Sequence, residues 1–224
     1  MTLETPHQEA ILEAATTIFA EHGFAGARVE AIAKAAGTNK AMLYYRVGDK
    51  ARLYELVVLR QFERAARAVE SAAGGVPLAG PAGPGAATAP NAPMTAVPAA
   101  ALLGRILTSM ADLFTTDPRL PRIMAWELAS GGANLPDSVM ALWGRILGVV
   151  APVAARAGFD PGPAYFSMAG SMILFCLTQP LRQRAAASPD SGLPPALAGL
   201  GQAGVHDMAA FLTALFTRAA ENPQ

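Results

Sequence analysis

The chain has 224 residues, of which 52% are hydrophobic and 15% are charged, and its formal net charge at neutral pH is zero. This length and hydrophobic content suffice for a buried core in one or two domains. The zero net charge excludes nucleic-acid binding by a generally basic surface, so such a function would require a local basic cluster. The single cysteine, Cys176, excludes an intrachain disulfide and indicates a reducing, cytoplasmic setting.

Residues 5 to 23 carry the signals of an amphipathic helix. Thr5 can cap it, Pro6 suits its first position, and Gln8 can close a capping box. One apolar stripe follows, made of Ile11, Leu12, Ala15, Ile18 and Phe19. Gly23 is expected to end the helix. The first 20 residues include three glutamates and no long apolar stretch, so no signal peptide is expected.

Two short helical patterns meet at Gly37. The first spaces its apolar residues as one helix face does, at Val29, Ile32, Ala33 and Ala36. Gly37 supplies the positive φ of a tight helix exit, and either Thr38 or Asn39 can cap the next helix. In that second helix Leu43 is expected to point inward. Two short helices joined by a glycine turn are typical of a helix-turn-helix.

The charges around this turn favour DNA binding. From residue 34 to residue 52 there are five basic side chains and one acidic side chain, Asp49. Such clusters bind phosphates through counterion release, and tyrosine hydroxyls and helix N-termini add hydrogen bonds. A basic run is commonly only a solvated helix face. Here the pair Tyr44–Tyr45 and the glycine turn lie within the same run, which favours the DNA-binding interpretation.

Three blocks of sequence resemble the tetracycline-repressor (TetR) family of bacterial transcription regulators. They are Phe19-Ala20-Glu21-His22-Gly23-Phe24, Ile32-Ala33-Lys34-Ala35-Ala36-Gly37, and Leu43-Tyr44-Tyr45-Arg46-Val47-Gly48-Asp49-Lys50-Ala51-Arg52-Leu53. The resemblance covers roughly residues 8 to 56 and is specific, because separated blocks agree in residue type and spacing. Two positions depart from the family pattern. Arg28 replaces a common capping Thr, so that cap is expected to be lost, and Val47 replaces a commoner Phe.

This resemblance implies a role for each part of the N-terminal region. The first helix braces the helix-turn-helix, and the helix from about Lys40 to Arg46 enters the major groove. The residues expected at base edges are Thr38, Lys40, Ala41, Met42 and Tyr44, and those expected at phosphates are Arg28, Tyr45, Arg46 and Lys50. Asn39 completes the predicted DNA-binding set. We assign residues 1–48 to the DNA-binding domain and residues 49–224 to a regulatory and dimerisation domain.

A fourth helix is expected from the cap at Asp49 to about Ala72, and it joins these two domains. Residues 74 to 98 differ in kind, with six prolines and not one charged side chain. They are predicted to form a flexible connection without a packed core. Helical patterns return at residues 98–114, 119–130 and 137–158.

The last two helical patterns predict a homodimer. Residues Ala164–Gln183 are apolar nearly all round in their first half, which requires burial on more than one side. Pro180 is expected to kink this helix or end its regular part. After a loop at about residues 187–204, Val205–Ala219 form an amphipathic stripe. Two such helices from each of two chains would make a four-helix interface, as is usual in the resembled family. The alternative is that both helices complete the core of the monomer.

Aromatic and Met-rich helices in the C-terminal two-thirds could enclose a small apolar effector. The candidate pocket residues are Trp126, Glu127, Met140, Trp143, Phe166, Met172, Phe175 and Gln179. Taken singly, a residue of this kind is more often ordinary core than a ligand contact. No metal-ligand spacing, phosphate-binding loop or nucleophile elbow is found, so no metal, cofactor or enzymatic activity is expected. The longest apolar run, Met172 to Leu177, is far shorter than the ~20 residues of a membrane span.

The sequence therefore predicts an all-α protein of about nine helices, three of them in the DNA-binding domain. Its expected function is that of a cytoplasmic, homodimeric transcriptional regulator. We expect it to act as a repressor that binds a palindromic operator and is released by a small apolar effector. The alternative is a small-molecule-binding protein with a vestigial helix-turn-helix.

Overall fold

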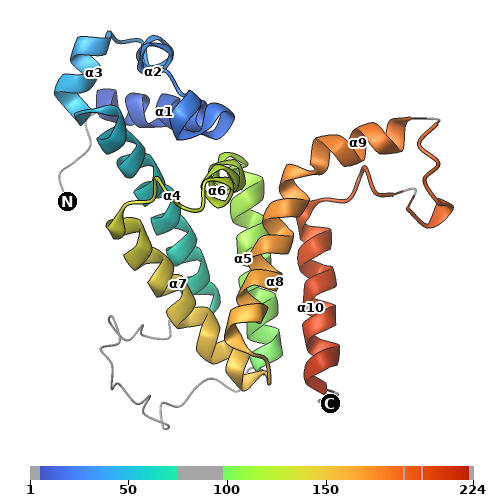
Figure 1. Cartoon of the computed structure of the whole chain (residues 1–224). Coiled ribbons are helices and arrows are strands. Elements are labelled where there is room, and N and C mark those ends of the chain that lie inside the picture. The colour runs from blue at the N-terminus through green and yellow to red at the C-terminus, as the bar shows by residue number, and fades with distance from the viewer. Residues whose placement is uncertain (1–5, 75–97, 189, 198, 222–224) are drawn as a thin grey trace. The chain divides into compact units, whose positions relative to one another are not determined.

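The computed structural model describes residues 6–74, 98–188, 190–197 and 199–221. Within these ranges it contains ten α-helices, one 3-10 turn at Pro195–Leu197 and no β-strand (Figure 1). The helices are α1 Pro6–Gly26, α2 Val29–Ala35, α3 Lys40–Val47, α4 Lys50–Ala72, α5 Ala99–Thr116, α6 Arg119–Ala129, α7 Asp137–Arg156, α8 Pro161–Leu177, α9 Gln179–Ala187 and α10 Val205–Glu221. The predicted all-α class is confirmed. The predicted cap at Thr5 and nearly all of the predicted 74–98 connection lie outside the described residues.

The chain forms two compact units. The first comprises residues 1–64 and 119–142, and the second comprises residues 65–118 and 143–224. Helices α4 and α7 each contribute residues to both units.

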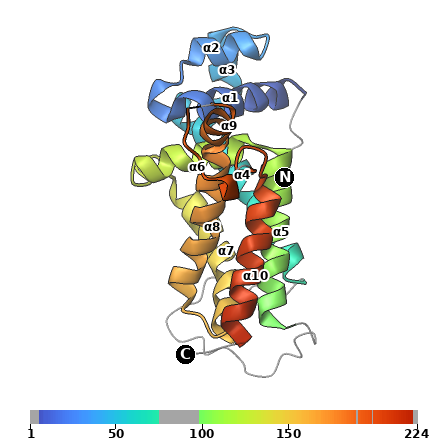
Figure 2. The same cartoon turned by 90° about the vertical axis from the view of Figure 1, so that its right-hand side faces the viewer.

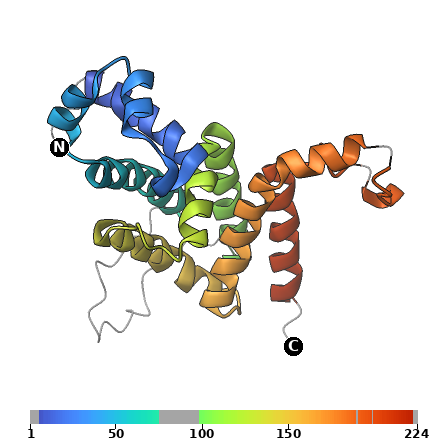
Figure 3. The same cartoon turned by 45° about the horizontal axis from the view of Figure 1, so that its top comes forward.

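The first unit is built on helices α1, α2 and α3, which pack against one another, and on α6, which packs along α1 (Figures 1 and 3). Its core consists of apolar side chains that are almost inaccessible to solvent. They are Leu12 and Phe19 from α1, Ile32 from α2, Leu43 from α3, and Leu53 and Tyr54 from α4. Each large apolar side chain buried in this way contributes about 1.5–3 kcal/mol, which makes the core the main source of stability.

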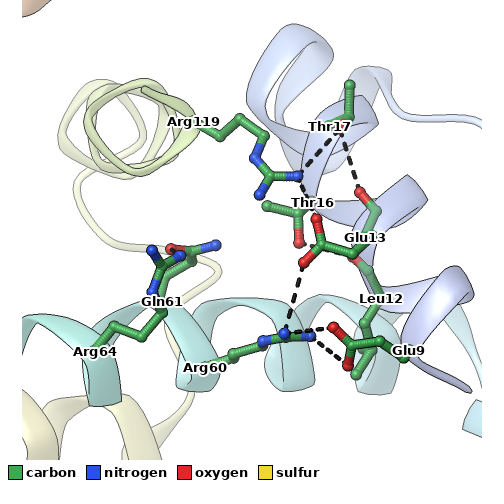
Figure 4. Close-up of polar contacts among 9 residues, drawn as sticks. All are labelled: Glu9, Leu12, Glu13, Thr16, Thr17, Arg60, Gln61, Arg64 and Arg119. Atoms are coloured by element: carbon green, nitrogen blue, oxygen red, sulfur yellow. Dashed lines mark hydrogen bonds and ion pairs between the residues drawn. The ribbon is translucent and has the colours of Figure 1, made fainter. Parts of the chain in front are cut away.

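Charged side chains join three helices of this unit at its surface (Figure 4). Arg60 on α4 donates to both carboxylate oxygens of Glu9 on α1 through its two terminal guanidinium nitrogens, at 2.8 and 2.5 Å. Arg119 on α6 donates to Glu13 on α1 at 2.8 Å. Glu13 also lies 3.6 Å from Arg60. One face of α1 is thereby linked to both α4 and α6.

The second unit is organised around α5 and α10, which pack along each other, with α8 against both (Figure 2). Gly104 on α5 faces Thr213 on α10 so closely that a Cβ at position 104 would lie 2.6 Å from the threonine Cγ2. The main buried side chains of these helices are Leu102, Leu103, Ile106 and Leu107 on α5, Met172 on α8, and Leu212 and Phe216 on α10.

The break expected near Pro180 is present, and it divides the predicted helix Ala164–Gln183 into two helices. Helix α8 already begins at Pro161 and ends at Leu177, and α9 follows after Thr178 with a bend of 52°. The break precedes Pro180 because a proline lacks an N–H and its ring clashes with the carbonyl four residues earlier, whereas it fits the first turn of a helix. Pro180 accordingly lies in the first turn of α9. This extra helix raises the expected number from about nine to ten.

Helix α7 is the one helix in the described ranges that is long and apolar enough by itself to cross a membrane. The core helix of a soluble protein has the same length and composition. Seven side chains of α7 are buried within the protein, namely Val139, Leu142, Ile146, Val149, Val150, Val153 and Ala154.

Candidate nucleic-acid interface

The turn between α2 and α3 forms as the sequence predicts. Gly37 has a φ of 66°, and the Thr38 backbone N–H donates to the Ala33 carbonyl at 2.9 Å, which ends α2. The side chain of Asn39 then accepts from the Met42 backbone N–H at 2.8 Å. Of the two predicted caps for α3, Asn39 is therefore the one in place.

Helices α2 and α4 also begin as expected. Arg28 occupies the N-cap position of α2 and makes no side-chain capping bond, so the predicted loss of a cap is confirmed. Asp49 accepts from the Arg52 backbone N–H at 2.8 Å and caps α4. Leu43 and Val47 hold α3 against the core, and this leaves the opposite face of α3 to the solvent.

The exposed face of α3 carries most of the predicted DNA-binding side chains. Tyr45 is 87% exposed, Met42 is 41% exposed and Tyr44 is 38% exposed, which is unusual for side chains of this size. Arg28, Asn39, Lys40, Ala41 and Arg46 are exposed as well, and Thr38 and Lys50 are partly exposed. The structure thus brings the predicted residues together on α2, α3 and the start of α4, with a free surface of mixed aromatic and basic character.

Lys40 is held by an acidic residue that the sequence analysis did not include. Its Nζ lies 2.6 Å from Oε1 of Glu30 on α2 and 5.7 Å from the centre of the Tyr44 ring. This hydrogen bond lowers the pKa of the Glu30 carboxyl and raises the pKa of Lys40. The two residues belong to different helices, so no helical spacing could have revealed the pair.

Lys50 lies beside the end of α1. Its ammonium stands 4.8 Å from the centre of the Phe24 ring and donates to the Ala25 carbonyl at 3.4 Å. These contacts fix the position of the charge while leaving further N–H donors for another acceptor.

Trp126 on α6 braces α1 behind the helix-turn-helix. Its indole N–H donates to the Ala20 carbonyl at 3.2 Å, and its ring lies directly over Gly23. A Cβ at Gly23 would approach the ring to 2.9 Å, and φ there is 65°. Glycine at this position therefore meets two requirements, a left-handed backbone and the close approach of the indole.

Glu127 is buried next to Trp126 and forms a polar cluster within the first unit. Its carboxylate accepts a hydrogen bond from the Tyr54 hydroxyl and longer ones, both at 3.4 Å, from Ser130 and Asn134. Burial, followed by the hydrogen bond to Glu127, raises the pKa of Tyr54. The Tyr54 ring also packs on Phe19 of α1, with the ring centres 4.8 Å apart. Tyr54 therefore contacts both α1 and α6.

The remaining pocket candidates do not gather in one unit. Met140 is 42% exposed in the first unit, whereas Trp143, Phe166, Met172, Phe175 and Gln179 belong to the second. There the Trp143 indole donates to the Tyr165 hydroxyl at 2.8 Å, and Phe166 packs on the Tyr165 ring. Met172 is fully buried and Gln179 is exposed. The predicted pocket stays a prediction. In the described part of the chain no group of three or more His, Cys, Asp or Glu side chains could hold a metal ion.

Residues 11–57 match the family model described as bacterial regulatory proteins, tetR family. Over 48 residues the chain is 46% identical to the HTH-type transcriptional repressor SCO4008 of Streptomyces coelicolor, a stretch that covers 21% of this chain. The chain spans about a quarter, 25%, of the length of this curated relative. The sequence similarity therefore concerns the helix-turn-helix region.

The fold similarity extends over nearly the whole chain. The TetR family transcriptional regulator PfmR from Thermus thermophilus superposes with a TM-score of 0.60 at 19% identity, over 93% of this chain and 97% of its own. The transcriptional regulator FadR from Bacillus subtilis, in complex with stearoyl-CoA, superposes with a TM-score of 0.63 at 14% identity, over 93% and 96%. At such identities these structures show a common fold.

Proposed function

We propose that this chain, whose residues 11–57 match the family model described as bacterial regulatory proteins, tetR family, is a homodimeric repressor that binds a palindromic operator. The observation that carries this proposal is the exposed face of α3. A helix held by a capped N-terminus and two buried side chains presents Met42, Tyr44 and Tyr45 to the solvent, with basic residues beside them. This arrangement suits major-groove readout by α3.

The roles within this surface follow from residue chemistry. Met42, Ala41 and Tyr44 would meet base edges and thymine methyl groups, together with Thr38 and Lys40. Arg28, Tyr45, Arg46 and Lys50 would bind phosphates, and such contacts set the position of the helix without reading sequence. Asn39 would act mainly through its cap, because its side-chain oxygen is already bound to the Met42 N–H.

The test is selection of bound sequences from random double-stranded DNA, followed by footprinting. We expect a pseudo-palindrome with half-sites one helical turn apart, ~34–36 Å, or somewhat more. Failure to enrich any sequence, combined with tight binding of an apolar ligand, would instead identify a small-molecule-binding protein with a vestigial helix-turn-helix.

Helices α8 and α10 support the proposed homodimer, because they expose large apolar side chains. On α10, Phe211 is 63% exposed and Leu215 is 51% exposed, and their spacing puts them on one face of the helix. On α8, Phe166 and Leu174 are 58% and 61% exposed. Clustered exposure of this kind marks an interaction surface.

Replacing Phe211 by Glu tests this interface. We expect the variant to sediment as a monomer and to lose cooperative binding to the two half-sites, because a charge would be buried at the interface. Leu197→Glu is the matched control, since Leu197 is 45% exposed in the 3-10 turn, outside the two proposed interface helices. A dimeric Phe211→Glu variant would refute the assignment of α10.

We further propose an apolar effector bound by the second unit, where Trp143, Tyr165 and Phe166 form an aromatic cluster. A ligand lowers DNA affinity only by the difference between its affinities for the two conformations. A thermal-shift screen of acyl-CoA thioesters and other apolar compounds tests this, since a protein of the same fold is known in complex with stearoyl-CoA. A ligand that stabilises the protein should then reduce operator binding.

A further inference from the structure

The ion pair between Glu30 and Lys40 lies on the surface proposed to bind DNA. Glu30 is in the first turn of α2, Lys40 is the first residue of α3, and their charged atoms are 2.6 Å apart. Both side chains are at least half exposed, at 64% for Glu30 and 50% for Lys40. The pair thus bridges the two helices of the helix-turn-helix on the solvent side of the Gly37 turn.

This pair is poorly suited to stabilising the fold. Exposed ion pairs contribute little to stability, because water screens them and two flexible side chains must be ordered. The turn itself is already fixed by Gly37, by the Asn39 cap and by the buried side chains of Val29, Ile32 and Leu43. The pair has a clearer effect on the charge available to DNA.

Lys40 is a cation at the N-terminus of the helix proposed to enter the groove. Phosphates of DNA would compete with Glu30 for its ammonium, and the Glu30 carboxylate would itself repel those phosphates. Tyr44, whose ring centre is 5.7 Å from the Lys40 nitrogen, keeps the ammonium on the same face. A DNA group that contacts Lys40 must therefore either replace Glu30 as the partner of the ammonium or bind the ammonium beside Glu30.

We propose that Glu30 is a specificity-determining residue: by holding Lys40, it lowers the affinity of this protein for random DNA more than its affinity for the operator. The inference rests on the proposed function and adds a restraint to it. Binding to random DNA depends on phosphate contacts, so withholding one cation suppresses it directly. On random DNA no base edge matches Lys40, so its ammonium is expected to contact phosphate there, whereas on the operator Lys40 is proposed to contact a base edge. Operator binding therefore depends less on a phosphate contact of Lys40.

The test compares Glu30→Gln with the wild-type protein on the selected operator and on random duplex DNA. Each phosphate contact contributes about 0.9 to the slope of log K against log salt, so one added contact gives a roughly 3- to 4-fold greater loss between 50 and 200 mM salt. We expect Glu30→Gln to bind random DNA several-fold more tightly at 50 mM salt, with a slope steeper by about one. The ratio of operator to random affinity should fall.

The double variant Glu30→Gln/Lys40→Met shows whether Glu30 acts through Lys40. If it does, adding Glu30→Gln to Lys40→Met should have much less effect than adding it to the wild-type protein. An equal effect in both backgrounds would overturn the proposal, because Glu30 would then act as a separate charge. Weaker DNA binding by Glu30→Gln would overturn it as well.

Glu21→Gln is the matched control for the removal of one negative charge. Glu21 lies in the same unit, and its one ion pair in the described residues is with its neighbour His22 at 3.7 Å. We expect its DNA affinity and salt slope to equal those of the wild-type protein. A gain as large as that of Glu30→Gln would attribute the effect to net charge alone. The wild-type protein separates the two proposals, because its failure to bind DNA would refute the proposed function itself.

Discussion

Gly23 gives the sharpest prediction of stability in this structure. Replacing it by Ala places a methyl group 2.9 Å from the Trp126 ring at a backbone position where φ is 65°. With φ 65° and ψ 179°, the backbone at Gly23 lies in a region essentially confined to glycine, which costs another residue about 1–3 kcal/mol, and forcing extra volume into a packed site costs about 1–3 kcal/mol more. We therefore expect Gly23→Ala to lower the free energy of unfolding by about 2–6 kcal/mol.

Gly131→Ala is the control that separates these two contributions. Gly131 has a φ of 67° and no heavy atom lies within 4 Å of its virtual Cβ, so this change carries the backbone term alone. Urea unfolding followed by far-UV circular dichroism measures both variants. Gly23→Ala should be less stable than Gly131→Ala by about 1–3 kcal/mol, and Trp126→Leu in the Gly23→Ala background should recover part of that difference. Equal losses for the two glycines would refute the close approach of Trp126 to α1.

Three further predictions concern single polar groups. Burial and the bond to Glu127 raise the pKa of Tyr54 above its ordinary value of 10.0, so the unfolded chain loses this proton first and stability should fall as the pH rises above about 10. Tyr54→Phe should weaken that dependence in alkaline unfolding curves, with the remainder due to Tyr165, whose pKa burial also raises, and it should cost about 1–3 kcal/mol at neutral pH. Lys50→Ala should weaken binding to all DNA about equally and reduce the salt slope by about one, whereas Tyr44→Ala should also change site preference in a selection experiment. Arg182 is buried and donates to the carbonyls of Phe175, Leu200 and Ala203. Arg182→Gln should therefore destabilise the protein by about 2–4 kcal/mol. It should also speed proteolysis near residues 190–204 in a limited-digestion assay.

The sequence predicts the helix-turn-helix closely because its signals are local. Gly37, Asn39 and Asp49 act on backbone groups within a few residues of themselves, so turn chemistry alone places them. Apolar spacing likewise predicts the buried side of each helix, as Leu43 shows. The break between α8 and α9 falls before Pro180 rather than at it, because a proline can either kink a helix or begin one, and local sequence does not decide between them.

Contacts between distant segments could not be predicted in this way. Residue type alone favours Trp126 as a pocket residue, but its indole packs on Gly23 of α1. Glu127 is predicted from its type to orient a ligand, but its carboxylate accepts from Tyr54 in the first unit. The residue type of an aromatic or acidic side chain does not show which distant segment it contacts, and the predicted pocket role of these two residues stays a prediction.

The distribution of ion pairs explains how a protein of zero net charge can offer a basic surface. Away from the helix-turn-helix, three arginines are paired with acids, namely Arg60 with Glu9, Arg119 with Glu13 and Arg145 with Glu70. Within the described residues, by contrast, Arg28, Lys34 and Arg46 form no ion pair.

Several of the acids that bring the net charge to zero are thus paired with arginines outside α2 and α3, and Lys34 and Arg46 of these two helices remain available to phosphates. The Glu30–Lys40 pair is the exception on this surface. Because the basic side chains of this surface are few, holding one of them back removes a sizeable share of the possible phosphate contacts, which is why Glu30, through Lys40, should affect how tightly the domain binds random DNA.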